Sequence, residues 1–379
     1  MLRSKNRIGL MMGACGVTMA LAGSANVALA QGPIRSPEVL PDHRIVFRLR
    51  APNAKEVFVG REGAQRLAMT KDDKGVWSVT TDAVEPDLYG YTFIVDGVGT
   101  LDPANSLMKP NILNTQSMVH VPGSGLPWEV SDVPHGTLVR HFYKSKVVGD
   151  DRDFYVYTPP GYDSRASKKY PVLYLLHGFS DDAGGWSAVG RAHVIMDNLI
   201  ASGKAKPMLV VMPLGYGAPE ILGLTGAPRT PDVGQRNIDK FAEALLTEVI
   251  PSVEKTYSVD TGVKSRAICG LSMGGGESIM TGLNHLDKFG WVGSFSGAMS
   301  MGGQDFGKSL PALDSGANSK LKLLWIGIGK DDFLLKNNQQ FTEWLKTKGV
   351  THTYTETAGA HTWLVWRRYL ADFAPLLFR

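Results

Sequence analysis

Short apolar segments separated by turn-forming residues fill the first part of the chain beyond residue 43. Val, Phe, Tyr and Thr are frequent in these segments and Gly, Pro, Asp and Asn lie between them, a pattern typical of antiparallel strands. The segments are residues 44–52, 55–60, 65–71, 75–81 and 89–97. The pattern predicts a small all-β, immunoglobulin-like sandwich over residues 43–102, preceded by a leader segment at 31–42.

A stretch rich in Pro and Gly follows the predicted sandwich. It runs from residue 103 to 136 and contains PANSLMKPN and VPGSGLPW. Such a composition is typical of turns and irregular connections. Residues 103–136 are therefore predicted to be a linker between two domains. Two domains also suit the length of the chain, 379 residues.

Apolar runs alternate with helical patterns over residues 137–379, which predicts a mostly parallel sheet covered by helices on both faces. The runs expected to be strands are residues 171–178, 206–215, 266–272, 321–329 and 351–359. Residues 237–257 carry one apolar helical stripe, in which Pro251 is expected to cause a kink. Ligands of such sheets bind beyond the carboxyl ends of the strands, so the residues after each run carry the functional information.

Residues 1–30 have the pattern of an export signal. Arg3, Lys5 and Arg7 precede an apolar segment, and Ala28-Leu29-Ala30 is a small-residue cleavage site. Cleavage before Gln31 and a secreted or periplasmic location are therefore predicted. The alternatives are a membrane anchor, for which the apolar run is short, and a lipoprotein attached through Cys15.

Charge and composition exclude several classes of protein. The signal holds three of the 40 Lys and Arg residues and none of the 36 Asp and Glu residues, so the mature chain carries a net charge of +1. That balance gives no support to a nucleic-acid partner or to a membrane surface after cleavage. Cys269 is then the single remaining cysteine, and it is expected to be a buried apolar residue within a strand.

A serine between glycines follows the third predicted strand. Gly270-Leu-Ser272-Met-Gly274 matches the G-x-S-x-G elbow that presents a nucleophile between a strand and a helix in the α/β-hydrolase fold. A serine hydroxyl needs a base and an orienting acid to become a nucleophile. In this fold the acid and then the histidine follow the serine along the chain.

Both partners are present in that order at the ends of later predicted strands. Asp331 and Asp332 follow one strand, and His361 follows the next. The oxyanion formed during acyl transfer also needs two N–H donors. We expect these from the backbone of Met273, next to the serine, and of Phe179, in the loop after the first strand. His177 in that loop is expected to hold it by hydrogen bonds.

Residues from about 138 to the end resemble esterase D-type α/β-hydrolases, in particular carbohydrate esterase family one. The matching stretches are YPVLYLLHGFSDDAGGW, RAICGLSMGGGES, GSFSGAMS, GIGKDDF and AGAHTWLVWRRYL. The family includes feruloyl esterases and acetyl xylan esterases, so the resemblance implies a serine esterase. It also implies that Asp332, which ends the G-x-x-D stretch, is the acid; Asp331 lies one position short and remains the alternative.

The predicted sandwich resembles carbohydrate-binding module family 48, through FRLRAPNAKEVFV, KGVWSVT, YTFIVDG and LDPANS. This resemblance implies a plant cell-wall polysaccharide, or its acylated oligosaccharides, as the partner. Trp77, Tyr89, Tyr91 and Phe93 could stack on sugars, but their alternation along strands favours a core position.

Other polar and aromatic residues give weaker signals. The remaining histidines lack the spacing of a zinc site, so neither a metal nor another cofactor is predicted. Asp181 and Asp182 are interpreted as a solvated loop face rather than a glycosidase pair. Trp186 could line an aromatic acyl pocket or pack the loop down.

The sequence thus predicts a secreted serine ester hydrolase that removes acyl groups, feruloyl first of all, from hemicellulose such as arabinoxylan. The predicted catalytic residues are Ser272, His361 and Asp332. Acetyl xylan esterase, siderophore (enterochelin-type) esterase and acyltransferase activities are alternatives, and a carbohydrate-binding protein is the non-enzyme alternative.

Overall fold

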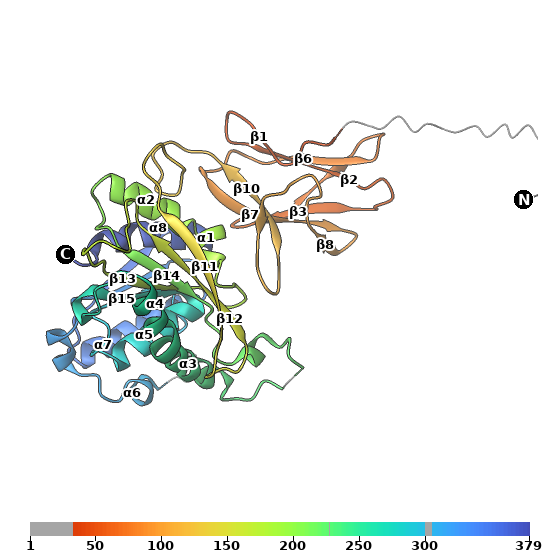
Figure 1. The fold of residues 1–379 in the computed structure, drawn as a ribbon. Helices are drawn as coiled ribbons and strands as arrows, with labels where there is room; N and C mark the ends of the chain where they lie inside the picture. The colour runs from red at the N-terminus through yellow and green to blue at the C-terminus, as the bar shows by residue number, and fades with distance from the viewer. Residues whose placement is uncertain (1–32, 227, 300–304) are drawn as a thin grey trace, which may run out of the picture. The chain divides into compact units, whose positions relative to one another are not determined.

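The computed structural model describes residues 33–226, 228–299 and 305–379, and residues Ile34–Arg379 form one compact unit (Figure 1). The predicted signal of residues 1–30 and the alternative lipid attachment at Cys15 lie outside the described residues. Among the described residues, no helix has the length and apolar character needed to cross a membrane.

Two antiparallel sheets make up the N-terminal region. One has the order β1 (Glu38–Val39), β2 (Ile45–Arg50), β6 (Val76–Thr80), β5 (Thr70–Lys71). The other has the order β4 (Leu67–Ala68), β3 (Val57–Arg61), β7 (Asp87–Val95), β10 (Gln116–Val121), β9 (Met108–Lys109), with β8 (Val98–Thr100) paired to β7. Side chains of both sheets share one core. Trp77, Tyr89, Tyr91 and Phe93 belong to it, as the core interpretation expects.

The N-terminal sheet extends beyond the predicted boundary at residue 102. Strand β10 lies inside the predicted linker of residues 103–136, yet its residues Ser117–Val121 pair with β7. Strand β10 has only six residues and is followed directly by Pro122 and Gly123, so its local sequence resembles a connection. The residues that link the two parts of the fold are therefore those between Val121 and Thr137, where the next strand begins.

An eight-stranded sheet forms the centre of the remaining chain. Its order is β11 (Thr137–Lys144), β12 (Asp151–Thr158), β14 (Leu209–Pro213), β13 (Val172–Leu176), β15 (Arg266–Leu271), β16 (Trp291–Phe295), β17 (Leu323–Gly329), β18 (Thr353–Thr357). The five predicted strands are β13, β14, β15, β17 and β18, and they pair in parallel where they are neighbours. The antiparallel hairpin of β11 and β12 and the short strand β16 were not predicted.

Helices cover both faces of this sheet, as an α/β-hydrolase fold requires (Figure 1). One core contains α1 (Gly185–Ala188), α2 (Ala192–Ala201) and α8 (Trp363–Phe373). The opposite core contains α3 (Val233–Ala244), α4 (Ile250–Thr256), α5 (Ser272–Asn284), α6 (Phe306–Ser309) and α7 (Leu335–Thr347). Short helical turns are η1 (Pro219–Leu222), η2 (Leu245–Val249), η3 (Val263–Ser265), η4 (Ser315–Ser319) and η5 (Ala374–Leu376).

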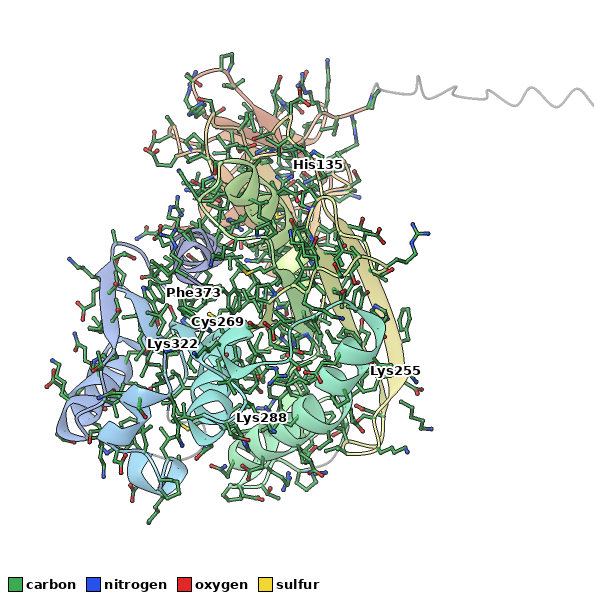
Figure 2. The ribbon with its side chains drawn as sticks, turned by 60° about the vertical axis from the view of Figure 1, so that its left-hand side comes forward. His135, Lys255, Cys269, Lys288, Lys322 and Phe373 are labelled. Carbon is green, nitrogen blue, oxygen red and sulfur yellow. The ribbon has the colours of Figure 1, made fainter. Side chains whose placement is uncertain are left out.

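Alternate residues of the central strands enter opposite cores. In β13, Leu173 and Leu175 lie in the first core, whereas Val172, Tyr174 and Leu176 lie in the second. This burial on both faces explains the continuous apolar runs of the sequence. Cys269 is a free, buried thiol in the first core, together with Phe373 (Figure 2).

The predicted helix of residues 237–257 is formed by α3, η2 and α4 in succession. Its apolar stripe is buried as expected. The turn η2 is π-helical and ends at Val249, two residues before Pro251, whose ring nitrogen has no hydrogen to donate. The expected disturbance at Pro251 therefore takes the form of a widened turn.

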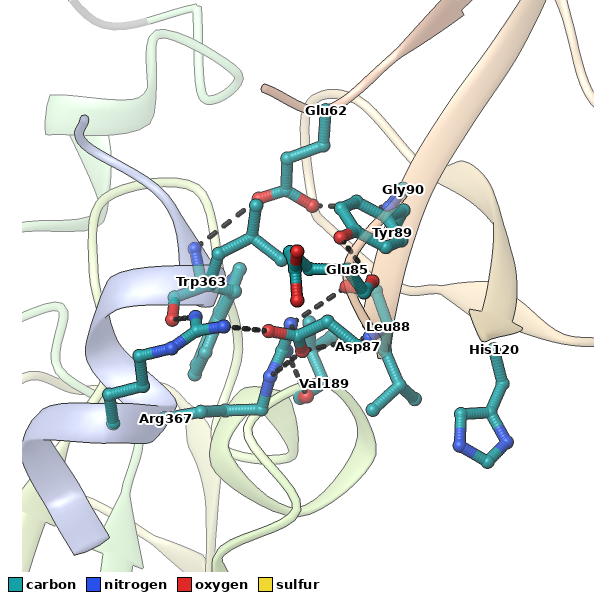
Figure 3. Close-up of polar contacts among 12 residues, drawn as sticks. Glu62, Glu85, Asp87, Leu88, Tyr89, Gly90, His120, Val189, Trp363 and Arg367 are labelled. Carbon is teal, nitrogen blue, oxygen red and sulfur yellow. Dashed lines mark hydrogen bonds and ion pairs between the residues drawn. The ribbon is translucent and has the colours of Figure 1, made fainter. Parts of the chain in front are cut away.

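Helix α8 also contacts the N-terminal region (Figure 3). Arg367 of α8 bonds to Asp87 and to the carbonyl of Leu88 at the start of β7. Glu62, beside β3, accepts a hydrogen bond from the N–H of Trp363, the first residue of α8, at 3.3 Å. The two parts of the fold are thus joined by polar contacts at the helix that begins just after His361.

Candidate active site

Ser272 lies at the sharp turn between β15 and α5. Its backbone has φ of 52°, in the left-handed region that side chains other than glycine rarely adopt. A Cβ at position 270 would lie 2.5 Å from the backbone of Gly274, and one at position 274 would lie 2.4 Å from the carbonyl oxygen of His177. Glycine is therefore required on both sides of the serine, because strand, helix and the loop after β13 converge there.

A continuous chain of hydrogen bonds runs from the serine to a carboxylate. Ser272 Oγ lies 2.9 Å from His361 Nε2, and His361 Nδ1 lies 2.8 Å from Asp332 Oδ2. With the Nδ1 hydrogen donated to Asp332, Nε2 is left to accept the serine proton. The three residues follow the carboxyl ends of β15, β17 and β18, which are parallel strands of one sheet with β16 between the first two.

Asp332, rather than Asp331, contacts the histidine. The Asp332 side chain is buried, and its second oxygen accepts a hydrogen bond from the N–H of Leu334 at 2.8 Å. Asp331 is exposed, and its backbone N–H donates to the carbonyl of Gly359. The carboxylate that faces His361 is thus fixed in its rotamer by its own loop.

The loop after β13 passes close to Ser272. A Cβ added to Gly178 would lie 3.4 Å from the Cβ of Ser272, so the backbone that leads to Phe179 runs directly beside the nucleophile. Met273 is the second residue of α5, and its N–H has no acceptor within the helix. Both amides nominated as oxyanion donors therefore belong to segments that flank the serine.

His177 holds this loop as a neutral residue. Its Nδ1 donates to the carbonyl of Gly178, and its Nε2 accepts from the N–H of Gly215 at 2.9 Å. Complete burial lowers the pKa of His177 to about 4. The ring joins the loops after β13 and β14. It is uncharged at neutral pH, and both of its nitrogens are already hydrogen-bonded, so it has no acid or base role.

Trp186 does not line a pocket in this structure. Its side chain is fully buried against Phe295 and Trp363, and its Nε1 donates to the carbonyl of Leu176. The nomination of Trp186 as a substrate-pocket residue is corrected accordingly: it packs the loop onto the sheet.

Asp181 is also placed differently from the prediction of a solvated loop face. It is 5% exposed, whereas Asp182 is half-buried and accepts from the N–H of Gly184. Burial raises the pKa of the Asp181 carboxyl to about 7. This burial could not be predicted locally, because Asn111 and Tyr216, which bond to Asp181, are distant from it in the chain.

Two aromatic rings that were not predicted to belong to the site flank His361. The ring of Phe333 lies 4.5 Å from the imidazole and is 76% exposed, and that of Trp366 lies 4.9 Å away. Trp366 Nε1 donates to the hydroxyl of Ser296 at 3.1 Å. Phe333 directly follows Asp332 in the sequence, and this adjacency could have marked it.

A buried carboxyl of α5 was also missed. Glu277 lies behind the nucleophile turn and accepts a hydrogen bond from Asn237 Nδ2 at 2.8 Å. Burial raises its pKa well above the ordinary value. Glu277 is the one charged residue of α5, and this is the signal that could have drawn attention to it.

This geometry can be compared with known proteins. The family model described as putative esterase matches residues 145–377, more than half of the chain. The chain belongs to the putative esterase family. It is also 31% identical over 342 residues to an endo-1,4-beta-xylanase/feruloyl esterase of Xylanibacter ruminicola, a match that covers 88% of this chain and 44% of that protein. An acetyl esterase of Caldicellulosiruptor saccharolyticus is 23% identical, with 54% of this chain and 82% of that protein covered.

Solved structures of esterases have the same fold. One ferulic acid esterase is 30% identical with a TM-score of 0.55, covering 64% of this chain and 97% of its own. A second, from Anaeromyces mucronatus and solved with ferulic acid, is 26% identical with a TM-score of 0.56, covering 66% and 93%. An enterobactin esterase from Shigella flexneri shares the fold over 88% of this chain and 92% of its own, at 19% identity and a TM-score of 0.66.

Membership of this family makes the chain a carboxylic ester hydrolase. Its fold is α/β-hydrolase-like, with an N-terminal all-β region. The expectation of an esterase is thereby confirmed. The chain spans about half the length of the first two curated relatives, 44% of one and 56% of the other.

Proposed function

We propose that this chain is a serine esterase that removes feruloyl groups from hemicellulose such as arabinoxylan. The observation that carries the proposal is the unbroken hydrogen-bond chain from Ser272 Oγ through His361 to Asp332. A hydroxyl aligned in this way with a base and a buried acid is the arrangement that acyl transfer needs.

The mechanism follows from the positions of these atoms. Ser272 Oγ attacks the ester carbonyl while His361 Nε2 takes its proton, and the resulting imidazolium is stabilised by Asp332. His361 then gives the proton to the leaving sugar hydroxyl, which leaves an acyl-enzyme on Ser272. Water activated by the same histidine attacks this ester and releases the acid.

The charge on the carbonyl oxygen is held by the backbone N–H groups of Met273 and Phe179. Met273 lies at the N-terminus of α5, where the helix dipole favours a negative charge. Phe179 follows the loop residue that passes beside Ser272. Removal of one such donor typically costs about 3 kcal/mol of transition-state stabilisation.

Two observations support an aromatic acyl group. Phe179 and Phe333 are exposed large apolar side chains, one in the oxyanion loop and one against the ring of His361. Exposed aromatic rings at a site mark a surface where an apolar ligand is bound. The relatives named as feruloyl or ferulic acid esterases support the same acyl group.

We place this activity outside the cytoplasm, on the export pattern of residues 1–30. The N-terminal β region is proposed to be an immunoglobulin-like, carbohydrate-binding-module-like domain that keeps the enzyme near the polysaccharide. This part of the proposal rests on the sequence resemblance and on the paired sheets with one shared core.

The test is the release of ferulate from methyl ferulate and from feruloylated arabinoxylan, measured beside acetate release from acetylated xylan. The protein without residues 1–30 is compared with its Ser272→Ala variant. We expect ferulate release by the parent protein and none by the variant.

Other outcomes would change the proposal in defined ways. Acetate release alone would replace the feruloyl substrate by an acetyl one, as in the acetyl esterase relative. Ferulate release that survives in Ser272→Ala would overturn the role of the serine. Hydrolysis of a catecholate triester without activity on either glycan would move the substrate to a siderophore.

A further inference from the structure

A loop of the N-terminal region reaches the loop that carries Phe179. Residues 110–115 connect β9 to β10, and the N–H of Ile112 donates to the carbonyl of Ser180 at 2.7 Å. Asn111 Nδ2 donates to Ser180 Oγ at 2.9 Å and to Asp181 Oδ1 at 3.1 Å. The N-terminal region therefore contacts the oxyanion loop through both backbone and side chain.

The amide of Asn111 uses its two ends for different segments. Its oxygen accepts from the N–H groups of Leu113 and Asn114, at 3.1 and 2.9 Å, and so closes its own turn. Its nitrogen directs both hydrogens to Ser180 and Asp181. An amide satisfied at both ends has a fixed orientation, so the donor end is held toward the oxyanion loop.

The residues that Asn111 holds are strained and buried. Ser180 has φ of 69°, a left-handed conformation that persists only where surrounding contacts impose it. Asp181 is almost fully buried, and the hydroxyl of Tyr216 donates to its carbonyl at 2.9 Å. The geometry of this loop therefore depends on its contacts with other segments.

The same residues lie next to the backbone that faces the nucleophile. A Cβ at Gly178 would lie 3.5 Å from Asp181 Oδ2 and 3.4 Å from the Cβ of Ser272. The Asp181 carboxyl thus packs behind Gly178, on the segment that sets the direction of the Phe179 N–H. A shift of this segment by about 1 Å can cost on the order of 10²-fold in rate.

We propose that Asn111 is a positioning residue of the esterase site, which holds Ser180 and Asp181 so that the N–H of Phe179 faces Ser272. The proposal rests on the proposed roles of Ser272 and Phe179. It assigns to the N-terminal β region a part in the chemistry, distinct from binding of a polysaccharide.

The charged and titratable neighbours of Asp181 come from three segments. Lys109 lies on β9, Asp182 on the same loop and Tyr216 in the loop after β14. Burial raises the pKa of Asp181, whereas the hydrogen bond from Asn111 and the charge of Lys109 oppose that rise. The Asn111 amide lowers the pKa of Asp181, whereas a carboxylate at position 111 would raise it. Activity of the variant should therefore depend on pH.

The first test is Asn111→Asp, assayed on p-nitrophenyl acetate and methyl ferulate between pH 5.5 and 8.5. The aspartate keeps an acceptor for the N–H groups of Leu113 and Asn114 but faces Asp181 with a second carboxyl. We expect kcat to fall by about 10- to 100-fold on both esters with KM changed by less than about threefold, because the oxyanion is common to both. The ratio of variant to parent kcat should rise as pH falls, since one proton shared by two carboxyls restores a hydrogen bond.

Asn114→Asp is the matched control. It adds the same charge to the same exposed loop, where Asn114 contributes only its backbone N–H to the turn. Its kcat and pH profile should follow the parent protein. Ser180→Ala is a second, milder variant that removes one acceptor of Asn111, and it should lower kcat by about 3- to 10-fold without the pH-dependent recovery.

The outcomes separate this inference from the proposed function. If Asn111→Asp and Ser180→Ala both keep the parent kcat on the two esters, Asn111 has no positioning role. The esterase proposal would still stand in that case, provided that the parent protein is active and Ser272→Ala is not. An equal loss of kcat in Asn114→Asp would also overturn the positioning role of Asn111. So would a change in Asn111→Asp that is limited to a higher KM on feruloylated arabinoxylan. A parent protein inactive on every ester would instead remove the proposed function itself.

Discussion

Arg367 and Asp87 form a completely buried ion pair between the two parts of the fold. Arg367 Nε donates to Asp87 Oδ1 at 3.0 Å, and neither side chain is exposed (Figure 3). Arg367 Nη1 donates to the carbonyl of Val189 and Nη2 to that of Leu88. The N-terminal region and helix α8 are therefore joined by a charge that water cannot solvate if its partner is lost.

Asp87→Ala is expected to lower the free energy of unfolding by about 3–5 kcal/mol, because it leaves the Arg367 charge buried and unpaired. Asp87→Asn, which keeps an acceptor oxygen without the charge, should cost less. Urea unfolding followed by tryptophan fluorescence measures both. A loss below about 1 kcal/mol in Asp87→Ala would mean that water or another side chain reaches the guanidinium.

The sequence predicted the parallel sheet and the nucleophile turn well because both depend on local chemistry. Strands buried on both faces read as unbroken apolar runs, and the turn needs Gly270 and Gly274 at fixed spacing. Strand β16 escaped prediction because WVGSF is short and contains a glycine. Asp332 could be chosen over Asp331 only through a family pattern, and the structure places Asp332 against His361.

Contacts between distant segments could not be predicted. Nothing near Asp181 in the sequence indicates burial, since the side chain of Asn111 that bonds to it is 70 residues away. Likewise, β10 could be recognised as a strand only through its pairing with β7. The local pattern therefore identified the reacting residues but not those that hold them in place.

The strained backbone at Ser272 should appear in stability measurements. Ser272→Gly is expected to be more stable than Ser272→Ala by about 1 kcal/mol, because φ of 52° costs a residue with a Cβ but not glycine. Both variants should lack esterase activity, and both should remain folded. Thermal unfolding at one pH compares them directly, and a glycine variant that is no more stable than the alanine variant would contradict strain at the turn.

Replacing each of the two adjacent aspartates by asparagine should affect kcat very differently. Asp332→Asn presents an amide N–H to His361 Nδ1 and so favours the wrong tautomer, which should lower kcat by about 10⁴-fold. Asp331→Asn removes only an exposed charge and should keep kcat within about twofold. Steady-state rates on methyl ferulate measure both variants, and the opposite order would move the acid role to Asp331.

Asp181 should make the stability of the protein depend on pH. Burial raises its pKa to about 7, so between about pH 4 and 7 the folded state keeps a proton that the unfolded state has released. The unfolded state is therefore favoured increasingly as pH rises through this window. Asp181→Asn removes this contribution, so the free energy of unfolding of the variant, relative to the parent, should rise by about 1.4 kcal/mol per pH unit and by at most about 4 kcal/mol at pH 7.

Urea unfolding of both proteins at pH 4, 5, 6 and 7 gives this difference. The lowered pKa of His177, about 4, acts in the opposite direction, with stability lost as pH falls from about 6.5 to 4. That contribution is present in both proteins and cancels in the comparison. Asp331→Asn changes the same charge at an exposed position and serves as the control, so a pH-dependent gain of equal size in that variant would show that net charge, rather than the burial of Asp181, is responsible.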